Sequence, residues 1–364
     1  MFAEAKYPEK IDPEELDNYL EQGWFRMDQT IFTTNFLNVT NKILSAIWLR
    51  ADLQDFVPSK TQLKLLKQNA RFQVSIQKAS LTQEKESLFS RYKQGITFDA
   101  SSSLHYLLYG NSTHLTSIYN TYEVTIYDGD VLIAAGFFDI GAKSAAGITS
   151  FYDPAYKKYS LGKFLIYQKI AYCQQQGLQY FYPGYFVPGY SLFDYKLDVG
   201  KKSLQYLQVS TQQWVPIEEF AHQLTPYQQM QFQLQLLRTA LNEMRIDGKI
   251  WQYKFFDANL YPDFAELQLF DFPLFLDCFD ASNPNLIPVI VYDVRDQRYH
   301  WLHCRAVGKN SIPELMPTIY ATYLLKVERE IFSAETPLEI ANILNTRIMP
   351  VHQEVSNENL SALS

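Results

Sequence analysis

Residues 119–187 constrain the fold more than any other part of this chain. Residues 119–127 alternate in the manner of a strand, residues 131–138 form an apolar run, and Asp128-Gly129-Asp130 between them is a strong β-hairpin signal. A third apolar stretch covers residues 145–151. These patterns predict an antiparallel hairpin followed by a further strand.

A helix and another strand are predicted next. Asp153-Pro154 ends the third strand, because proline lacks an N–H group and disfavours helical geometry just before it. Ser160 is a candidate N-cap and Gly177 a candidate C-terminal stop, and residues 178–187 form an aromatic and apolar strand. The order hairpin, strand, helix, strand is that of the acyltransferase core, in which an acyl donor meets an amine between two splayed strands. The predicted fold class is therefore α+β: a mixed sheet flanked by helices, with an extra C-terminal α+β region.

The predicted helix opens at Ser160-Leu161-Gly162. Unpaired backbone N–H groups and the positive end of the helix dipole suit this position to a phosphate or a developing oxyanion. Many helices begin in this way with nothing bound, so this feature alone is a weak indication of a site.

The size of the chain predicts more than one domain. With 364 residues, 47% hydrophobic and 20% charged, the chain can bury a large core. We expect an N-terminal region at 1–95, a catalytic domain at 96–212 and a C-terminal extension at 213–364. No apolar run approaches the roughly 20 residues that span a bilayer, and the N-terminus lacks the apolar stretch of a signal peptide. We therefore expect a cytoplasmic protein with no membrane partner.

Charge and cysteine content exclude several classes of protein. The net charge of -7 argues against sequence-independent binding to nucleic acid, so we expect no DNA partner, and RNA contacts must come from a local basic patch. Three cysteines without paired spacing argue against a disulfide framework. His300, His303 and Cys304 lie close in sequence, but positions 300 and 303 of a strand point to opposite faces, so we expect no metal site.

One basic patch is predicted on the helix expected after Pro58. Four basic residues share one helix face, namely Lys60, Lys64, Lys67 and Arg71, while Leu63, Leu66 and Ala70 line another. The basic face could bind the acceptor stem of an RNA, or it could be an ordinary solvated helix face.

Aromatic residues are dense between residues 180 and 195. Aromatic faces can stack the terminal bases of an RNA, at roughly 1–3 kcal/mol per base. For Tyr180, Phe181 and Phe186, packing is the better interpretation.

Several motifs resemble one enzyme family. Residues 151–154 (Phe-Tyr-Asp-Pro), Ser160-Leu161-Gly162, Gly177-Leu178 and Tyr182-Pro183-Gly184-Tyr185, ending in Tyr195-Lys196, resemble the C-terminal half of the arginyl- and leucyl-tRNA-protein transferases. Upstream, residues 56–62 (Phe-Val-Pro-Ser-Lys-Thr-Gln), Lys67-Gln68-Asn69 and Gly23-Trp24 with Arg26 look like N-terminal motifs of the same family. The resemblance covers about residues 15–200 and implies nothing about the rest of the chain.

The resemblance implies a fold similar to the acetyltransferase superfamily, an activity and a set of site residues. The donor would be a charged tRNA, bound by Leu161, Tyr182, Gly184, Tyr185 and the basic helix, and the acceptor would be a protein N-terminus, usually Asp or Glu, bound by Tyr195 and Lys196. Ser160 and Gly162 would stabilise the reacting ester. Glu123 and Asp139 are candidate proton relays, because the family has acids in similar places, although either could be a structural hydrogen-bond acceptor. No cofactor is expected beyond the tRNA co-substrate, no Ser-His-Asp set is visible, and no oligomeric state is indicated.

The chain also departs from the family. Residues 31–47 contain no cysteine where family members commonly carry a cysteine cluster, which excludes a metal or iron-sulfur site there. Tyr190, Leu192 and Phe193 stand where the family has cysteine, lysine and methionine, so one cation that could bind an acidic acceptor is missing. Two alternatives therefore stay open: a non-catalytic relative that binds RNA or protein, and an acetyl-CoA-dependent N-acyltransferase. The second is weakened because the Gln/Arg-x-x-Gly-x-Gly phosphate loop is absent near residues 156–162.

The region after residue 210 has no assigned function. An amphipathic helix is predicted at residues 227–244, a hairpin at 286–292 and 299–306 across Arg295-Asp296-Gln297, and a helix at 315–331.

Overall fold

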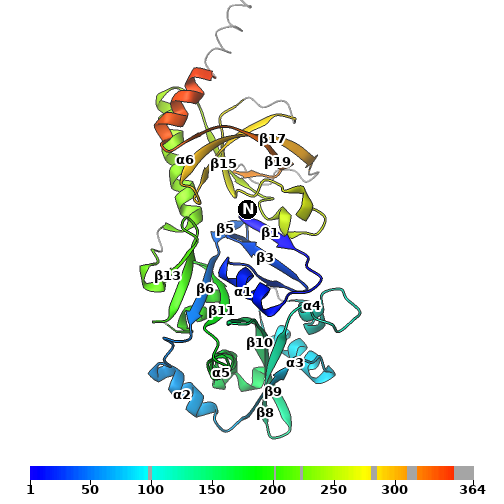
Figure 1. Ribbon diagram of the computed structural model, residues 1–364. Helices are drawn as coiled ribbons and strands as arrows, with labels where there is room; N and C mark the ends of the chain where they lie inside the picture. The colour runs from blue at the N-terminus through cyan, green and yellow to red at the C-terminus, as the bar shows by residue number, and fades with distance from the viewer. Residues whose placement is uncertain (97–100, 201, 222–223, 280–284, 310–317, 348–364) are drawn as a thin grey trace, which may run out of the picture.

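The computed structural model describes residues 1–364 except 97–100, 201, 222–223, 280–284, 310–317 and 348–364. Figure 1 shows a large sheet with its helices in one half of the molecule, a second sheet at the opposite end, and small N-terminal sheets between them. The architecture is α+β, as predicted. Within the described residues, no helix is both long enough and apolar enough to cross a membrane.

The large sheet has eight strands in the order β13-β12-β6-β11-β10-β9-β8-β7. Its strands are β6 (Ile47–Asp52), β7 (Gln73–Lys78), β8 (Thr121–Asp128), β9 (Val131–Ile140), β10 (Ser144–Tyr152), β11 (Tyr180–Phe186), β12 (Leu204–Gln208) and β13 (Gln213–Pro216). The sheet thus takes two strands from the first 95 residues.

The centre of this sheet confirms the predicted order of hairpin, strand, helix and strand. β8 and β9 pair antiparallel, and β10 pairs antiparallel with β9. β10 and β11 are parallel but pair only between residues 144–146 and 180–182. Beyond that point β10 stays with β9 and β11 stays with β6, so the two strands part as the splayed-pair prediction required.

Helices cover both faces of the large sheet (Figure 1). The helix α5 (Leu161–Gln175) packs on β9 and β10 on one face, with α2 (Lys60–Asn69) beside it. On the other face lie α3 (Gln83–Gln94) and α4 (Leu104–Tyr109), whose side chains form a separate apolar cluster with Phe137 and Phe151.

Small N-terminal sheets connect the two halves of the molecule. β1 (Ala3–Lys6), β3 (Thr30–Thr34) and β2 (Phe25–Met27) form one sheet, β4 (Phe36–Val39) and β5 (Lys42–Ser45) form another, and α1 (Pro13–Glu21) packs near β10. Phe2, Phe36 and Ile43 belong to the apolar core of the C-terminal sheet. The core of the C-terminal sheet therefore extends into the small N-terminal sheets, whereas the large sheet has apolar clusters of its own.

The C-terminal sheet has six strands in the order β18-β14-β15-β16-β17-β19. Its strands are β14 (Lys249–Tyr253), β15 (Leu274–Asp277), β16 (Ile287–Asp293), β17 (Arg298–Lys309), β18 (Ile319–Tyr320) and β19 (Tyr323–Ala334), and α6 (Pro226–Glu243) packs against β15 and β16. The predicted helix at residues 227–244 and the predicted hairpin are confirmed.

The predicted helix at residues 315–331 is wrong. Residues 315–317 lie outside the described residues, and the rest forms β18 and β19. β19 pairs with β17 along nearly its whole length, and this pairing with a partner distant in sequence decides its conformation.

Short 3-10 helices complete the fold. They are η1 (Pro154–Tyr159), η2 (Ser191–Asp198), η3 (Ile217–Glu219), η5 (Ala258–Leu260) and η6 (Ala265–Leu267). The first two flank the parted strands: η1 leads from β10 into α5, and η2 follows β11.

Candidate active site

The turn between β10 and α5 has an unusual backbone. Ser160 follows η1 with a φ of 50°, a left-handed conformation, and its side chain makes no capping hydrogen bond. Left-handed non-glycine residues are uncommon and cluster at functional sites. At Gly162 an added Cβ would lie 3.6 Å from the Tyr152 ring, so only a small residue fits freely beneath that aromatic face.

Tyrosines border the parted ends of β10 and β11. Tyr92 of α3 lies 5.4 Å from the ring of Tyr152, and burial raises the pKa of Tyr185 and of Tyr195 to about 12. Tyr195 nevertheless leaves 41% of its surface exposed, so its ring edge faces solvent while its hydroxyl is withdrawn toward Tyr92 and Tyr185. These hydroxyls stay protonated near neutral pH and can donate hydrogen bonds to a polar ligand.

Tyr182 and Gly184 have different surroundings. Tyr182 is 3% exposed and packs edge-on against Trp214 at 5.5 Å, so its ring fills the interior beside α1. Gly184 has a φ of 89°, and an added Cβ there would lie 3.0 Å from the Lys196 ammonium nitrogen. A side chain at position 184 would therefore displace Lys196.

Lys196 is a buried ammonium without a carboxylate partner. It is 9% exposed, donates one hydrogen bond to the carbonyl of Tyr185 at 2.8 Å, and lies about 5 Å from the rings of Tyr185 and Phe193. Burial lowers its pKa to about 7. Within the described residues it forms no ion pair. An ammonium can donate three hydrogen bonds, so Lys196 retains capacity for an anionic ligand.

The Gly23-Trp24 segment lies beside this lysine. The Phe25 ring lies within 4 Å of the position that a Cβ on Gly184 would take, and it packs on Trp48 at 5.6 Å. Trp48 in turn packs edge-on against Tyr185 at 5.0 Å. Two motifs far apart in sequence thus form one aromatic wall around Lys196. Sequence reasoning missed Phe25 and Trp48: the motif at Gly23-Trp24 and Arg26 could have indicated Phe25, whereas Trp48 lies in none of the motifs.

The helix α2 ties the two site loops together. Ser59 and Gln62 form a capping box, and the Gln62 amide also donates to the carbonyl of Asp198 at 2.9 Å, just after Lys196. Asn69 donates to the carbonyl of Tyr159 at 3.0 Å, just before Ser160. These contacts explain why glutamine and asparagine occupy the ends of the two upstream motifs.

The predicted apolar face of this helix is partly wrong. Leu63 is 54% exposed and Ala70 is exposed, while Gln62 and Asn69 are buried together with parts of Leu65 and Leu66. The polar residues are buried because main-chain carbonyls of η1 and η2 accept their hydrogen bonds.

The basic face of this helix is exposed as predicted. Lys60, Lys64 and Lys67 form no ion pair within the described residues, whereas Arg71 pairs with Asp128 at 3.4 Å. Sequence reasoning missed Lys157 and Lys158, which are exposed on η1, the neighbour of α2. Together, the exposed lysines of α2 and η1 form a basic surface beside Ser160.

Glu123 and Asp139 both lie in buried ion pairs. Glu123 binds Lys85 at 2.6 Å and the backbone N–H of Ser80 at 3.0 Å. Asp139 binds Arg26 at 3.0 Å and the Thr121 hydroxyl at 2.6 Å, and burial raises its pKa against the lowering effect of Arg26. Both carboxylates are fully buried and already bind several partners, which favours a structural role for each. A proton-relay role stays a prediction.

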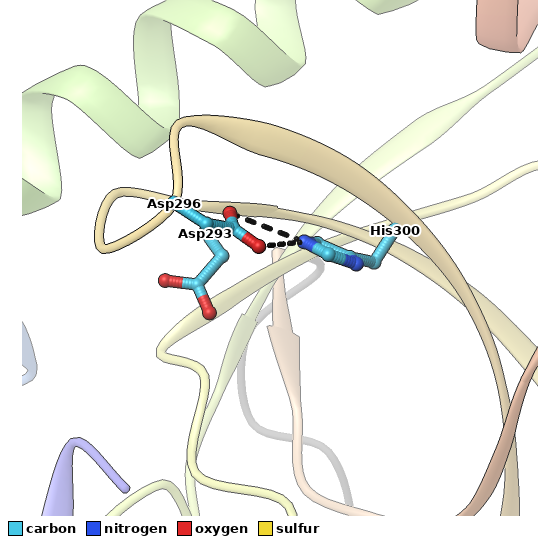
Figure 2. Close-up of side chains that lie close together, drawn as sticks. All are labelled: Asp293, Asp296 and His300. Atoms are coloured by element: carbon cyan, nitrogen blue, oxygen red, sulfur yellow. Dashed lines mark hydrogen bonds and ion pairs between the residues drawn. The ribbon is translucent and has the colours of Figure 1, made fainter. Parts of the chain in front are cut away.

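One group of side chains in the C-terminal sheet has the composition of a metal site. Ligand atoms of Asp293, Asp296 and His300 lie within 4.8 Å of one another. Figure 2 shows Asp296 paired with His300, at 3.0 Å, while the Asp293 carboxylate points away from the ring. Asp293 is bound by Arg295 at 2.6 Å, and His300 also pairs with Glu330 at 2.7 Å. Existing ion pairs account for the cluster, and His303 lies instead next to Arg329.

Comparison with known proteins now identifies the family. Residues 84–207 match the family described as "Arginine-tRNA-protein transferase, C terminus". The aspartate/glutamate leucyltransferase of Azorhizobium caulinodans is 30% identical over 216 residues, which are 56% of this chain and 84% of that protein. The chain belongs to the arginyl- and leucyl-tRNA-protein transferase family. The Leptospira interrogans aspartate/glutamate leucyltransferase is 29% identical over 218 residues, 59% of this chain and 83% of that protein.

This transferase also shares a limited similarity with solved acetyltransferase structures. One is the glucosamine N-acetyltransferase region of a fungal β-N-acetylglucosaminidase, with 14% identity and a TM-score of 0.31, covering 52% of this chain and 21% of that chain. The assignment of the fold rests instead on the order and pairing of the strands around β10 and β11.

Proposed function

We propose that this enzyme transfers leucine or arginine from its tRNA to the α-amine of proteins that begin with Asp or Glu. Lys196 carries the proposal: a buried ammonium that forms no ion pair with any described residue, beside the parted strands, suits the side chain of an acidic N-terminal residue. The relatives' names favour leucine as the donor and Asp or Glu as the acceptor. Because charged tRNA is used where proteins are made, the same proposal places the enzyme in the cytoplasm.

The proposed reaction is an aminolysis of an ester. The neutral α-amine attacks the ester carbonyl, a C–N bond forms, the C–O bond to the tRNA 3′ oxygen breaks, and that oxygen leaves with a proton. The α-amine has an ordinary pKa near about 7.7–8.0, so a large share is already neutral at working pH. No protein nucleophile is required. Positioning of amine and ester, worth roughly 7–11 kcal/mol in favourable systems, dominates the catalysis.

The basic surface of α2 and η1 is proposed to bind the tRNA, and Ser160 with Leu161 and Gly162 to hold its aminoacyl end. The exposed lysines flank the left-handed turn at Ser160, where the unpaired N–H groups of α5 begin. The Tyr185 ring lies next to Lys196, 5.1 Å from its ammonium. The donor is proposed to enter beside Ser160 and the acceptor beside Lys196, while the buried Tyr182 supports the wall from within.

The activity itself is tested with purified protein, radiolabelled leucyl- or arginyl-tRNA, and peptides that begin with Asp, Glu, Arg or Lys. We expect label from one of these tRNAs in the Asp and Glu peptides, and little in the Arg and Lys peptides, because a buried ammonium repels a cationic side chain. The appearance of label chiefly in the Arg and Lys peptides would reverse the acceptor assignment. Absence of label from every peptide with both donors would favour the non-catalytic alternative.

The basic surface is tested by charge reversal. Lys64→Glu with Lys67→Glu should weaken tRNA binding by about 10-fold or more near physiological salt and lower the slope of log K against log salt by about 2. Binding is measured by filter retention between 50 and 250 mM salt. The matched control is Lys254→Glu with Lys326→Glu, just after β14 and on β19 of the C-terminal half, far from Ser160 in sequence and fold. Equal effects of the two pairs would show that α2 is an ordinary solvated face.

A further inference from the structure

Lys169 is, like Lys196, a buried ammonium that forms no ion pair with the described residues, and the reaction described above does not use it. It lies on α5, is 1% exposed, and donates to the carbonyls of Phe137 at 2.9 Å and Thr149 at 2.8 Å and to the Ser150 hydroxyl at 3.1 Å. Within the described residues it forms no ion pair. The ammonium therefore donates all three of its hydrogen bonds to groups on β9 and β10.

Lys169 contacts β10 at an irregularity in that strand. The register between β10 and β9 shifts between Gly147 and Thr149, which leaves Ile148 without a partner on β9. A bulge of this kind breaks the ladder and leaves carbonyl groups in need of donors. The ammonium supplies those donors. Gly136 makes room for it, because a Cβ at that position would lie 3.0 Å from both the terminal carbon and the nitrogen of Lys169.

The bulge lies where the two site strands separate. β10 and β11 pair up to Ala146 and Tyr182, and the bulge begins at the next residue of β10. From that point β10 no longer bonds to β11, so main-chain groups on this side of β10 face the space between the strands. A backbone N–H held there can donate to the oxygen of an ester carbonyl as charge develops on it.

An ammonium at this position is costly for stability. Burial lowers the pKa of Lys169 to about 7, and the groups that act against this effect are Cys173 on the same helix and Asp139 across the sheet. An apolar side chain of similar size would avoid the desolvation penalty. Packing alone therefore does not explain why position 169 carries a lysine.

We propose that Lys169 is a positioning residue for the transfer reaction: it holds the β10 bulge in the geometry in which the main chain at Ile148 binds the carbonyl of the aminoacyl ester. The proposal rests on the proposed transferase function. Lys169 touches neither donor nor acceptor and acts through the backbone of β10. Its loss should therefore slow the chemical step and leave the binding of tRNA, which involves α2 and η1, nearly unchanged.

The first test is Lys169→Met in the full chain. We expect kcat for transfer to an Asp peptide to fall on the order of 10-fold to 100-fold, as when an oxyanion donor is misplaced, with the KM for aminoacyl-tRNA within about 2-fold of wild type. Circular dichroism and thermal melting establish that the variant is folded at the assay temperature. A control on the exposed end of the same helix, Gln175→Met, should leave both constants unchanged.

The second test moves the ammonium without removing it. Gly136→Ala places a methyl group against Lys169 and the Ser150 hydroxyl and should give the same fall in kcat with the same KM. Folded variants with wild-type kcat, or a KM for tRNA that rises while kcat stays constant, would overturn the positioning role. An inactive wild-type enzyme would instead refute the transferase function, so the two failures are distinguishable.

Discussion

Lys196→Met is expected to lower kcat/KM for peptides that begin with Asp or Glu by about 100-fold or more while making the folded protein more stable. The loss follows because a charge-assisted hydrogen bond to a buried carboxylate disappears. The gain follows because replacing a buried, unpaired ammonium with an apolar side chain removes a desolvation penalty, about 1–4 kcal/mol in comparable cases. Transfer assays and urea unfolding measure the two effects on the same samples.

The pH dependence of this stability difference has a definite sign. The pKa of Lys196 is lowered from 10.5 to about 7 in the folded protein. Between these two values the unfolded chain holds a proton that the folded chain has released, so the stability of the wild type rises with pH relative to the variant. The advantage of Lys196→Met should be largest at pH 7 or below and should shrink toward pH 10.

The same titration should appear in acceptor binding. The protonated ammonium is the form that binds a carboxylate, so the KM for an Asp peptide should rise as the pH increases above about 7 in the wild type. Lys202→Met, an exposed lysine a few residues further on, is the matched control and should change neither KM nor stability appreciably. A Lys196→Met protein that is less stable but equally active would show that Lys196 is only a structural cation.

Asp139→Ala is expected to destabilise the protein by about 3–5 kcal/mol, because it leaves the Arg26 guanidinium buried without its carboxylate. Arg26 also donates to the carbonyl of Leu108, and its guanidinium lies 4.5 Å from the Tyr119 ring, so it cannot turn toward solvent without breaking these contacts. Urea unfolding measures the loss. The control Asp128→Ala removes a partly exposed carboxylate that binds Arg71 and the Tyr156 hydroxyl, and it should cost about 1 kcal/mol.

Asp139 also offers a test of its alternative role. If it relayed the proton of the attacking amine, Asp139→Asn would abolish transfer while the protein stayed folded and stable. We expect instead that Asp139→Asn lowers the stability of the protein. The fraction that remains folded should keep a kcat close to that of the wild type. The double variant Arg26→Met with Asp139→Leu should recover part of the stability, since no unpaired charge remains.

The sequence predicted the centre of the fold because its patterns there are local. The hairpin at Asp128-Gly129-Asp130 and the helix after Ser160 depend on turn chemistry and on spacing within a few residues. The strand β19 was mistaken for a helix because pairing with β17, distant in the chain, decides its conformation. Strand preference follows from packing partners more than from the residues themselves.

The candidate site was likewise predicted from the sequence only in part. The sequence motifs indicated Gly184, Tyr185, Lys196 and the basic residues of α2 as site residues. Their roles in binding stay predictions. The apolar face of α2 was partly misassigned, since Gln62 and Asn69 look like surface residues until the carbonyls of Asp198 and Tyr159 are placed against them. Glu123 and Asp139 looked available for proton transfer until Lys85 and Arg26 were found beside them.

By itself, then, the sequence determined the order of the central strands and helix, the family motifs and which residue types stand in them, because periodicity, turns and short spacings are properties of neighbouring residues. Only the tertiary structure decided which charges are paired and which are not. Nothing in the sequence indicates that the side chain of Lys196 or of Lys169 is buried, yet both are withdrawn from water while Lys157 and Lys158 near Ser160 are exposed. Burial and pairing are set by side chains that lie far apart in the chain, and the free energy of a charge depends on those surroundings.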